Sequence, residues 1–417
     1  MTMNAKRRRA HDKLAALPGV RPVRRPVVPG GRHEFDLYYV RTGRKSMNPL
    51  VIIPGGPGAA SVALYRGLRR HAAAKGLDVI MMDHRGVGMS RHDDRGNDLP
   101  PEALTIEQAV NDIAAVLDDA QVEKAMIYGT SYGTYLAAGV GVRHPNRVHS
   151  MVLDSPVLSA RDINAARNAT RRVLWDGDDP DAAELAPKVR RLVDDGVLTP
   201  EAGQLTAAMY GFAGPDVLTR QLDLLLHGKQ GLWTLLDHTS RFLFERKAPY
   251  RHEPDLVGRI GFRELNYGAD PDGKPLDPAV AYHEFVNEPM KFEAEPYDLT
   301  AEMPKFYWPT AVISGGRDLI TPRAVAEEIV SLIPDSVLVE LATAGHSAVD
   351  VRERAALEIV EAVYHGDISR LSARAKELDA RPSGLGVRLL VGAIGAAAAI
   401  ESALPAAIPR VVQRAIS

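Results

Sequence analysis

The sequence Gly-Thr-Ser-Tyr-Gly at residues 129–133 lies between an apolar run and a helical pattern, and it constrains the fold more than any other stretch. The run at 125–128 predicts a buried strand, and the residues after the serine predict a helix over 132–144. A sharp turn from strand to helix has no room for bulky side chains beside its central residue, which accounts for the two glycines. The chain is therefore expected to place Ser131 at the end of a strand in a sheet that helices cover.

Strand and helix patterns alternate on both sides of this motif. Thr105, with Gln108 three residues later, forms a capping box that predicts the start of a helix. Strands that alternate with helices form a mostly parallel sheet with helices on both faces, so we predict an α/β fold. The predicted strands cover residues 35–40, 50–53, 78–82, 125–128, 148–153, 310–313 and 337–341.

The alternation lapses after Pro156 and resumes near residue 306. The intervening stretch is rich in Arg, Asp, Leu and aromatic residues and contains predicted helices at 182–192 and 217–226. We interpret it as a mainly helical cap inserted into the core. The predicted organisation is a basic N-terminal arm (1–32), a first part of the core (33–156), the cap (157–305), a second part of the core (306–365) and a C-terminal helical tail (366–417).

Charge and composition exclude several classes of function. The 417 residues include 51 basic and 53 acidic ones, so the chain lacks a general cationic field and we do not expect it to bind nucleic acid. The sequence contains no Cys, which excludes disulfides, thiolate metal sites and a cysteine nucleophile. Any nucleophile must be an oxygen or a Lys, and we expect neither a metal nor a cofactor.

A serine hydroxyl needs a base, and the base needs a group that fixes its tautomer. Asp318 follows the predicted strand at 310–313, and His346 follows the one at 337–341. Both therefore lie where parallel strands end, at the same edge of the sheet as Ser131. The chain order Ser, Asp, His is the order that a Gly-x-Ser-x-Gly fold uses, so these three are the predicted catalytic residues.

Stabilising an oxyanion requires two hydrogen-bond donors. One is expected to be the backbone N–H of Tyr132, which follows the serine. The other should come from the loop Pro-Gly-Gly-Pro-Gly at 54–58, which follows the strand at 50–53. Gly56 is the predicted second donor, because Pro57 has no N–H.

Five short motifs, taken together, resemble those of a known family. The chain is similar, over about residues 33–365, to the serine aminopeptidases of the α/β-hydrolase fold, the proline iminopeptidase and tripeptidyl aminopeptidase family. The Asp-x-Arg-Gly-x-Gly-x-Ser stretch occurs more widely in this fold, and we interpret it as a structural turn. The motifs are Gly-Gly-Pro-Gly at 55–58, Asp-His-Arg-Gly-Val-Gly-Met-Ser at 83–90, Gly-Thr-Ser-Tyr-Gly at 129–133, Arg-Asp-Leu-Ile-Thr-Pro at 317–322 and Gly-His at 345–346.

The resemblance implies the release of N-terminal residues from peptides, with a helical cap that recognises the free amine. An α-amino group with a pKa of about 8 is largely charged at neutral pH, so a carboxylate should meet it. The segment 281–285 looks like the family segment that carries such an acid, which points to Glu284. Two departures are present: Pro54 replaces a frequent His, and Leu319 replaces the second acid of some proline iminopeptidases. The second departure shifts the expected substrate toward another N-terminal group or a longer peptide.

Two other classes of function stay open. The same three residues would cleave any acyl bond that the cap admits, so an esterase or lipase-like hydrolase of small or lipid esters is the alternative. A catalytically idle binding protein is a further alternative, which the complete set of Ser, His and Asp disfavours. The expected partner is a small peptide or ester substrate.

The two ends of the chain are unusual in composition. Residues 1–32 hold nine Lys or Arg and one Asp, and we interpret them as a solvated arm. They do not read as a secretory signal, so a cytoplasmic location is expected. The apolar run at 389–400 is too short to span a bilayer, which needs about 20 residues in a helix. It is interpreted as packing on its own core, with peripheral membrane contact and self-association as the open alternatives.

Overall fold

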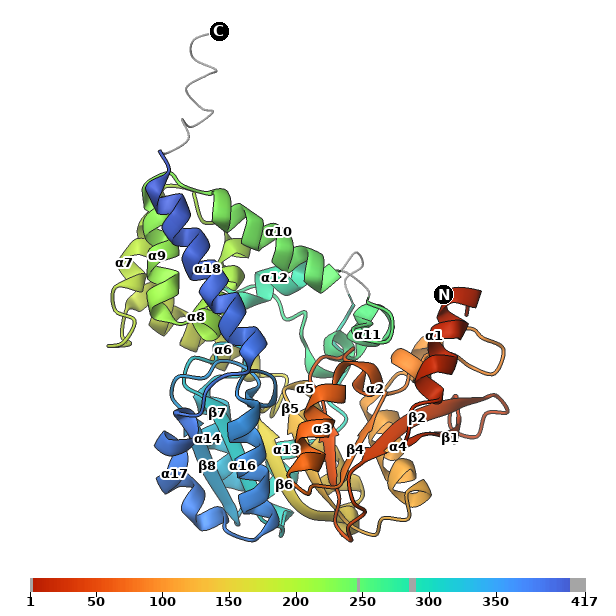
Figure 1. The fold of residues 1–417 in the computed structure, drawn as a ribbon. Coiled ribbons are helices and arrows are strands. Elements are labelled where there is room, and N and C mark those ends of the chain that lie inside the picture. Colours follow the sequence, from red (N-terminus) through yellow and green to blue (C-terminus); the bar gives the residue numbers. More distant parts are fainter. Residues whose placement is uncertain (1–2, 246–247, 285–289, 406–417) are drawn as a thin grey trace.

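The structure is a computed structural model, and it describes residues 3–245, 248–284 and 290–405. Its centre is an eight-stranded sheet with the strand order β1-β2-β4-β3-β5-β6-β7-β8 (Figure 1). The strands are β1 (Val20–Pro26), β2 (Glu34–Thr42), β3 (Leu50–Ile53), β4 (Val79–Met82), β5 (Ala125–Thr130), β6 (Val148–Asp154), β7 (Thr310–Gly315) and β8 (Ser336–Leu341).

The sheet is mostly parallel, as predicted. Strands β1, β2 and β4 pair antiparallel at one edge, and the pairs from β4 through β3, β5, β6 and β7 to β8 are parallel. Every residue of β3, β5 and β7 is buried, because helices cover both faces of a parallel sheet. The predicted α/β fold is confirmed.

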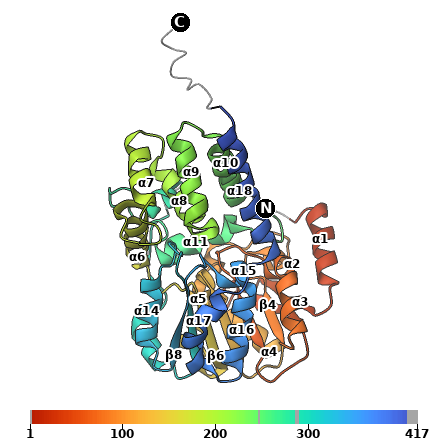
Figure 2. The same cartoon turned by 60° about the vertical axis from the view of Figure 1, so that its left-hand side comes forward.

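Helices pack on both faces of the sheet (Figures 1 and 2). Val51 and Ile53 of β3 belong to one apolar cluster, and Leu50 and Ile52 belong to the other, because successive side chains of a strand point to opposite faces. The first cluster includes α4 (Ile106–Asp119), α5 (Tyr132–Arg143) and α14 (Arg323–Leu332), and the second includes α3 (Arg66–Ala74), α16 (Glu353–Tyr364) and α17 (Leu371–Asp379). Three single-turn helices, α2 (Ser61–Leu64), α13 (Leu299–Glu302) and α15 (Ala348–Val351), complete this part.

A mainly helical unit lies above one edge of the sheet (Figure 1). Much of it is held by an apolar cluster of its own, which includes Leu185, Leu218 and Leu222. Because the sheet resumes with β7 only after this unit, it is an insertion into the core, and we call it the cap. Its helices are α6 (Asp162–Arg171), α7 (Leu185–Asp194), α8 (Pro200–Ala213), α9 (Pro215–Leu226), α10 (Gly231–Glu245), α11 (Pro254–Leu265) and α12 (Pro278–Glu284).

The first 32 residues are more ordered than a solvated arm would be. They contain α1 (Ala5–Ala15) and the edge strand β1, so the sheet begins before residue 33. Arg7 is 5% exposed, and its guanidinium donates to both carboxylate oxygens of Glu253 and to the carbonyl of Gly88. The interpretation of this segment as a solvated arm is wrong for α1, because one of its arginines is a buried anchor.

The C-terminal part divides into two elements. Helix α17 packs against β8 and therefore belongs to the core. Helix α18 (Leu385–Ala403) leaves the core and lies along the cap helices α9 and α10 (Figures 1 and 2). It has 19 residues where the apolar run predicted 12, and among the described residues it is the one helix long and apolar enough to cross a membrane.

Candidate active site

Ser131 occupies the turn between β5 and α5. Its backbone has φ 52° and ψ −126°, a conformation that a residue with a side chain rarely adopts. The two flanking residues must be glycines, because neither position has room for a Cβ atom. A Cβ at Gly129 would lie 2.3 Å from the carbonyl oxygen of Gly133, and a Cβ at Gly133 would lie 2.2 Å from that of Ile53. The sequence motif is thus explained by close backbone packing, which holds Ser131 above the sheet.

Asp318 and His346 meet beyond the ends of β7 and β8. The Nδ1 atom of His346 lies 2.9 Å from Oδ2 of Asp318. The same Oδ2 accepts from the hydroxyl of Thr321, and Oδ1 accepts from the N–H groups of Ile320 and Thr321. Because its carboxylate accepts these four hydrogen bonds, Asp318 is fixed in place and holds the imidazole ring by its Nδ1–H.

The two groups shift each other's pKa. Burial acts to raise the pKa of Asp318, but the charge of His346 and the hydrogen bonds to the carboxylate outweigh it and lower this pKa below 3.8. Burial acts to lower the pKa of His346, but the charge of Asp318 and their hydrogen bond outweigh it and raise this pKa above 6.5. The pair therefore favours an ionised carboxylate beside an imidazole that readily accepts a proton.

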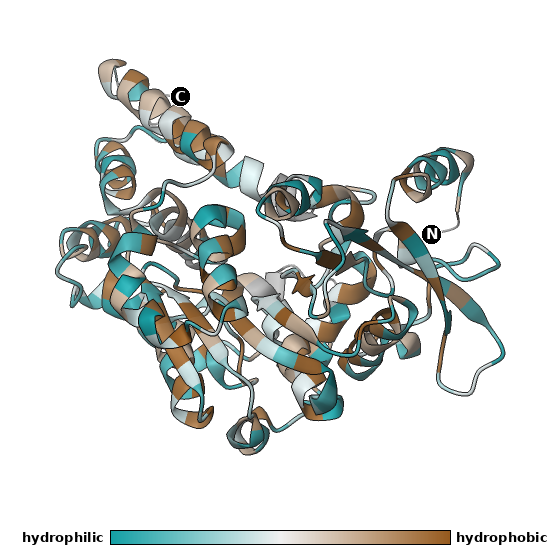
Figure 3. Cartoon of the chain, turned by 60° about the horizontal axis from the view of Figure 1, so that its bottom comes forward, coloured by the Kyte–Doolittle hydropathy of each residue, from teal (hydrophilic) through white to brown (hydrophobic). Residues whose placement is uncertain are grey.

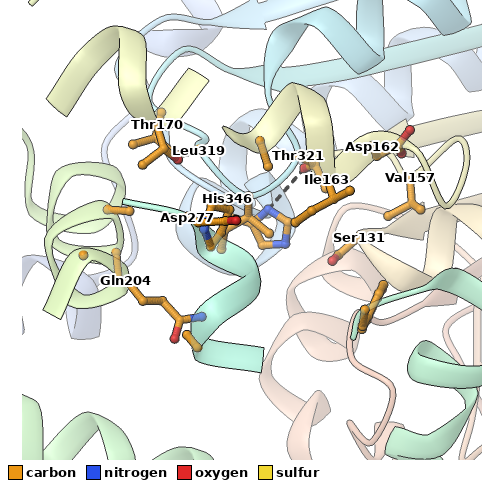
Figure 4. Close-up of a pocket in the computed structure, with 18 of the residues that line it drawn as sticks. Ser131, Val157, Asp162, Ile163, Thr170, Gln204, Asp277, Leu319, Thr321 and His346 are labelled. Atoms are coloured by element: carbon orange, nitrogen blue, oxygen red, sulfur yellow. Dashed lines mark hydrogen bonds between the residues drawn. The ribbon is translucent and has the colours of Figure 1, made fainter. Parts of the chain in front are cut away.

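Ser131 and His346 face the same cavity of about 460 Å³ between the sheet and the cap (Figure 4). The hydrogen bonds among the described residues do not include one between Ser131 Oγ and His346. The hydrogen bond between a catalytic base and its nucleophile often forms only when substrate is bound, so this arrangement is compatible with catalysis. The structure brings the three predicted residues to one edge of the sheet, and their catalytic roles stay predictions.

The two predicted oxyanion donors lie beside the nucleophile. Gly56 lines the cavity with Ser131, and Tyr132 follows Ser131 at the start of α5. A Cβ at Gly55 would lie 3.2 Å from the Cβ of Ser131, so this loop passes close to the nucleophile. No hydrogen bond within the described part of the chain occupies the N–H of Gly56 or of Tyr132. Both groups are therefore free to bind a ligand oxygen.

The charged groups of the cavity wall are acidic apart from His346. The described lining includes Asp162, Asp237 and Asp277, and it includes no Lys or Arg. Asp277 is bound to Arg167, whose Nε lies 2.9 Å from Oδ1. The carboxylate of Asp162 instead accepts from the N–H of Leu158 and from the hydroxyl of Ser159, and burial raises its pKa to about 6. Asp162 is therefore a carboxylate of this wall that neutral groups, rather than a cation, hold in place.

Asp162 was not singled out by the sequence. Its only local signal is its place in the first turn of a helix, where an acidic residue is common for structural reasons. Glu284, the acid that the family resemblance indicates, is the last residue of α12, but its side chain lies outside the described residues. Ala281, one turn earlier in α12, lines the cavity. Leu319 lines it as well and is 6% exposed, so the replacement of an acid by leucine alters the wall of the site.

A second polar cluster behind the catalytic residues was also missed. Asp154 ends β6, and its fully buried carboxylate accepts from the N–H groups of Ala348 and Val349, which open α15. The N–H of Ser347, directly after His346, donates to the hydroxyl of Ser155. These hydrogen bonds connect the loop that carries His346 to β6, the strand next to the one that ends at the nucleophile. No short sequence pattern predicts such a contact.

Comparison with known proteins identifies the fold family of the chain. A family model described as the alpha/beta hydrolase fold matches residues 48–353. The chain is 22% identical over 318 residues to a probable proline iminopeptidase of Leptolyngbya boryana, which covers 75% of this chain and 86% of that protein. It is 23% identical over 315 residues to a proline iminopeptidase of Neisseria meningitidis serogroup A, which covers 76% of this chain and 88% of that protein.

A solved structure shows the same fold. The crystal structure of proline iminopeptidase from Mycobacterium smegmatis superimposes with a TM-score of 0.52 at 19% identity, over 84% of this chain and 99% of that one. The family match spans most of the chain, from the Gly-Gly-Pro-Gly loop to beyond His346. The chain therefore belongs to the α/β-hydrolase fold family and is a hydrolase of that fold.

Proposed function

We propose that this hydrolase is a serine aminopeptidase that works through an acyl-enzyme. Ser131 Oγ attacks the carbonyl carbon of the first peptide bond while its proton passes to Nε2 of His346. Asp318 keeps the proton on Nδ1 of the ring and stabilises the imidazolium that forms. The oxyanion accepts hydrogen bonds from the N–H groups of Gly56 and Tyr132, each worth about 3 to 4 kcal/mol in the transition state.

The second half of the reaction repeats these steps with water. Collapse of the tetrahedral intermediate breaks the C–N bond, and the imidazolium of His346 gives its proton to the departing amine. Water then attacks the ester carbonyl on Ser131 and gives a proton to His346. Release of the acid returns that proton to the serine oxygen, so no cofactor is needed.

The acidic wall of the cavity is the observation that carries the choice of an aminopeptidase. A peptide with a free N-terminus brings an ammonium group to within a few bonds of the reacting carbonyl. Asp162 lines the same cavity as Ser131, and its carboxylate accepts from backbone N–H groups and a hydroxyl rather than from a cation. Such a carboxylate gains most from an incoming ammonium, because burial has removed much of its water.

The relatives and the residue at position 319 together indicate which part of the substrate is recognised. Two relatives that match over most of their length are named a probable proline iminopeptidase and a proline iminopeptidase, which supports recognition of an unblocked N-terminus. Leu319 places an apolar side chain in the wall where some members have a second acid. We therefore propose the free amine, rather than proline itself, as the feature that this site recognises, with Glu284 as a further acid that would meet it.

A second candidate is an esterase of small or lipid esters. Most side chains of the cavity wall are apolar, including those of Val157, Ile163 and Leu265. An apolar acyl group would bury these surfaces without any need for a carboxylate. The two candidates differ in one respect that can be measured, namely whether a free amine on the substrate matters.

The distinguishing experiment is a substrate panel. Aminoacyl p-nitroanilides with free and with acetylated amines would be compared with p-nitrophenyl esters of several chain lengths. An aminopeptidase should prefer the free amine, whereas equal or better turnover of acetylated anilides and simple esters would favour the esterase.

The variant Asp162→Asn sharpens this test. It should lower kcat/KM for free-amine anilides about 10- to 100-fold, because a charge-assisted hydrogen bond is worth about 1.5 to 3 kcal/mol. Activity on esters should hardly change. Asp216→Asn is the matched control, since Asp216 is an exposed cap residue outside the cavity lining. An equal loss on all substrates would show that Asp162 does not recognise the amine.

A further inference from the structure

Helix α18 exposes a continuous apolar face. Its large exposed side chains are Leu385 (68% exposed), Leu389 (65%), Leu390 (52%) and Ile400 (65%), and Leu404 (57%) follows the helix. Leu385, Leu389 and Ile400 lie on one stripe, because steps of three and four residues return to the same side of a helix. At 1.5 Å per residue this helix is about 28 Å long. An apolar surface of this kind on a soluble unit marks an interaction site.

The opposite side of α18 is attached to the cap. Ile394 and Ala398 are buried against cap helices. The carboxylate of Glu401 accepts from the N–H groups of Gly231 and Leu232 at the start of α10. The ammonium of Lys229 donates to the carbonyls of Glu401 and Ser402. These contacts fix which face of the helix is turned outward.

The charges of α18 are divided between the two sides. The helix sequence contains two ionisable residues, Arg388 and Glu401. Glu401 is bonded to the cap, whereas Arg388 is exposed. The sequence that follows, 406–417, adds Arg410 and Arg414 and contains no Asp or Glu. Within α18 the exposed charge is therefore the positive one of Arg388, on a helix whose other residues are mostly apolar (Figure 3).

A smaller cavity lies between the base of α18 and the catalytic residues. Val387 of α18 and Phe212 of α8 line one cavity of about 200 Å³, and Phe212 is 36% exposed. Leu319 and His346 line this cavity as well as the larger one that holds Ser131. The surface at the base of α18 thus borders the back of the active site.

We propose that the outer face of α18 binds the surface of an anionic membrane. The helix lies in the plane of the bilayer, with Leu385, Leu389 and Ile400 inserted and Arg388 at the level of the headgroups. A helix that crossed the bilayer would have to give up its bonds to Lys229 and to the start of α10. A second copy of the chain would bring no acid from α18 to face Arg388, because Glu401 is engaged with the cap.

The test uses the full chain and two kinds of vesicle. Vesicles of phosphatidylcholine alone and of phosphatidylcholine with phosphatidylserine are sedimented with the protein, and the bound fraction is measured. The chain should bind the phosphatidylserine vesicles, and added salt should weaken this binding. Absence of binding to either vesicle, or equal binding to both, would overturn the proposal.

Variants assign the binding to α18. Leu385→Ser, Leu389→Ser and Ile400→Ser combined should lower the partition coefficient at least tenfold, since each removes several apolar carbons that would insert into the bilayer. Met47→Ser with Leu64→Ser is the matched control, because both residues are exposed on the core (88% and 44%). Unchanged binding of the triple variant would contradict the proposal.

Two further measurements keep the test decisive. Turnover of a small soluble ester should be unchanged in the triple variant, which shows that it folds. If it does not fold, Arg388→Glu takes its place and should weaken binding to phosphatidylserine vesicles. Sedimentation velocity without lipid is run in parallel. A dimer that the variant converts to a monomer, together with absent vesicle binding, would assign the surface to a second copy and overturn the membrane proposal.

Discussion

The core wall and the cap wall of the active-site cavity are built in different ways. On the core side, Ser131, Asp318 and His346 follow the ends of three parallel strands, and backbone contacts fix their surroundings. On the cap side, helices α6, α8 and α12 contribute side chains that rest on apolar packing and on pairs such as Arg167 with Asp277. We therefore propose that the core wall carries out the chemistry and that the cap wall selects the substrate.

The largest effect should come from the core wall. Ser131→Ala should lower kcat about 10⁶-fold for every substrate, because loss of the nucleophile removes the whole covalent route. Circular dichroism and the melting temperature should be unchanged. Ser240→Ala is the control, since Ser240 lines the same cavity but its hydroxyl donates to the carbonyl of Asp237. Comparable turnover by the Ser131→Ala and Ser240→Ala variants would show that Ser131 is not the nucleophile.

Arg7→Ala tests how core and cap are joined. Glu253, which directly precedes α11, would lose its closest cation and stay buried, and a broken buried pair costs about 3 to 5 kcal/mol. The free energy of unfolding, measured by urea denaturation, should fall by this amount. Arg8→Ala is the matched control, because Arg8 is the exposed neighbour on the same helix. Equal stability of the two variants would contradict an anchoring role for Arg7.

Glu284→Gln tests the proposed recognition of the substrate amine. If this residue meets the substrate amine, the variant should lower kcat/KM for aminoacyl amides about 10²- to 10³-fold. The ammonium of the substrate would then be buried without a partner, which costs about 3 to 5 kcal/mol. Simple esters, which have no amine, should be turned over as before. Equal losses on both substrates would show that the residue supports the fold instead.

The smallest expected effect is a shift in the pH dependence of kcat/KM. His346 must be neutral to accept a proton, and its pKa is raised above 6.5, so kcat/KM should fall as the pH drops through this raised value. The charge of Asp154 helps to raise the pKa of His346. Asp154→Asn should therefore move the acid limb to lower pH, by less than about one unit. An acid limb below pH 6.5 in the unmodified enzyme would contradict the raised pKa.

The core wall could be predicted from the sequence because its signals are local. The strand at 50–53 agrees with β3 in both bounds, and the expected helix after Ser131 begins at Tyr132. Each candidate catalytic residue follows a strand whose apolar run is visible by itself. Strand β1 was missed, because an edge strand with two prolines and three arginines does not show the apolar alternation of a covered one.

The sequence contains no comparable local pattern for the cap wall or for the contacts of the two ends of the chain. Arg7 and Glu253 are 246 residues apart, and neither is distinctive in its own segment. Asp162 looks like an ordinary helix-start acid until the cavity around it is seen. The side of α18 that faces the cap depends on α9 and α10, which the helix meets only after folding. Such contacts arise from tertiary packing, which a single sequence does not reveal.

The most direct test of the central claim is covalent labelling with a fluorophosphonate, followed by intact mass measurement and peptide mapping. One phosphonyl group should be added, on Ser131, and the rate of labelling should fall sharply in His346→Gln. Labelling of a different residue, or labelling of Ser131 that does not depend on His346, would contradict the proposed catalytic site.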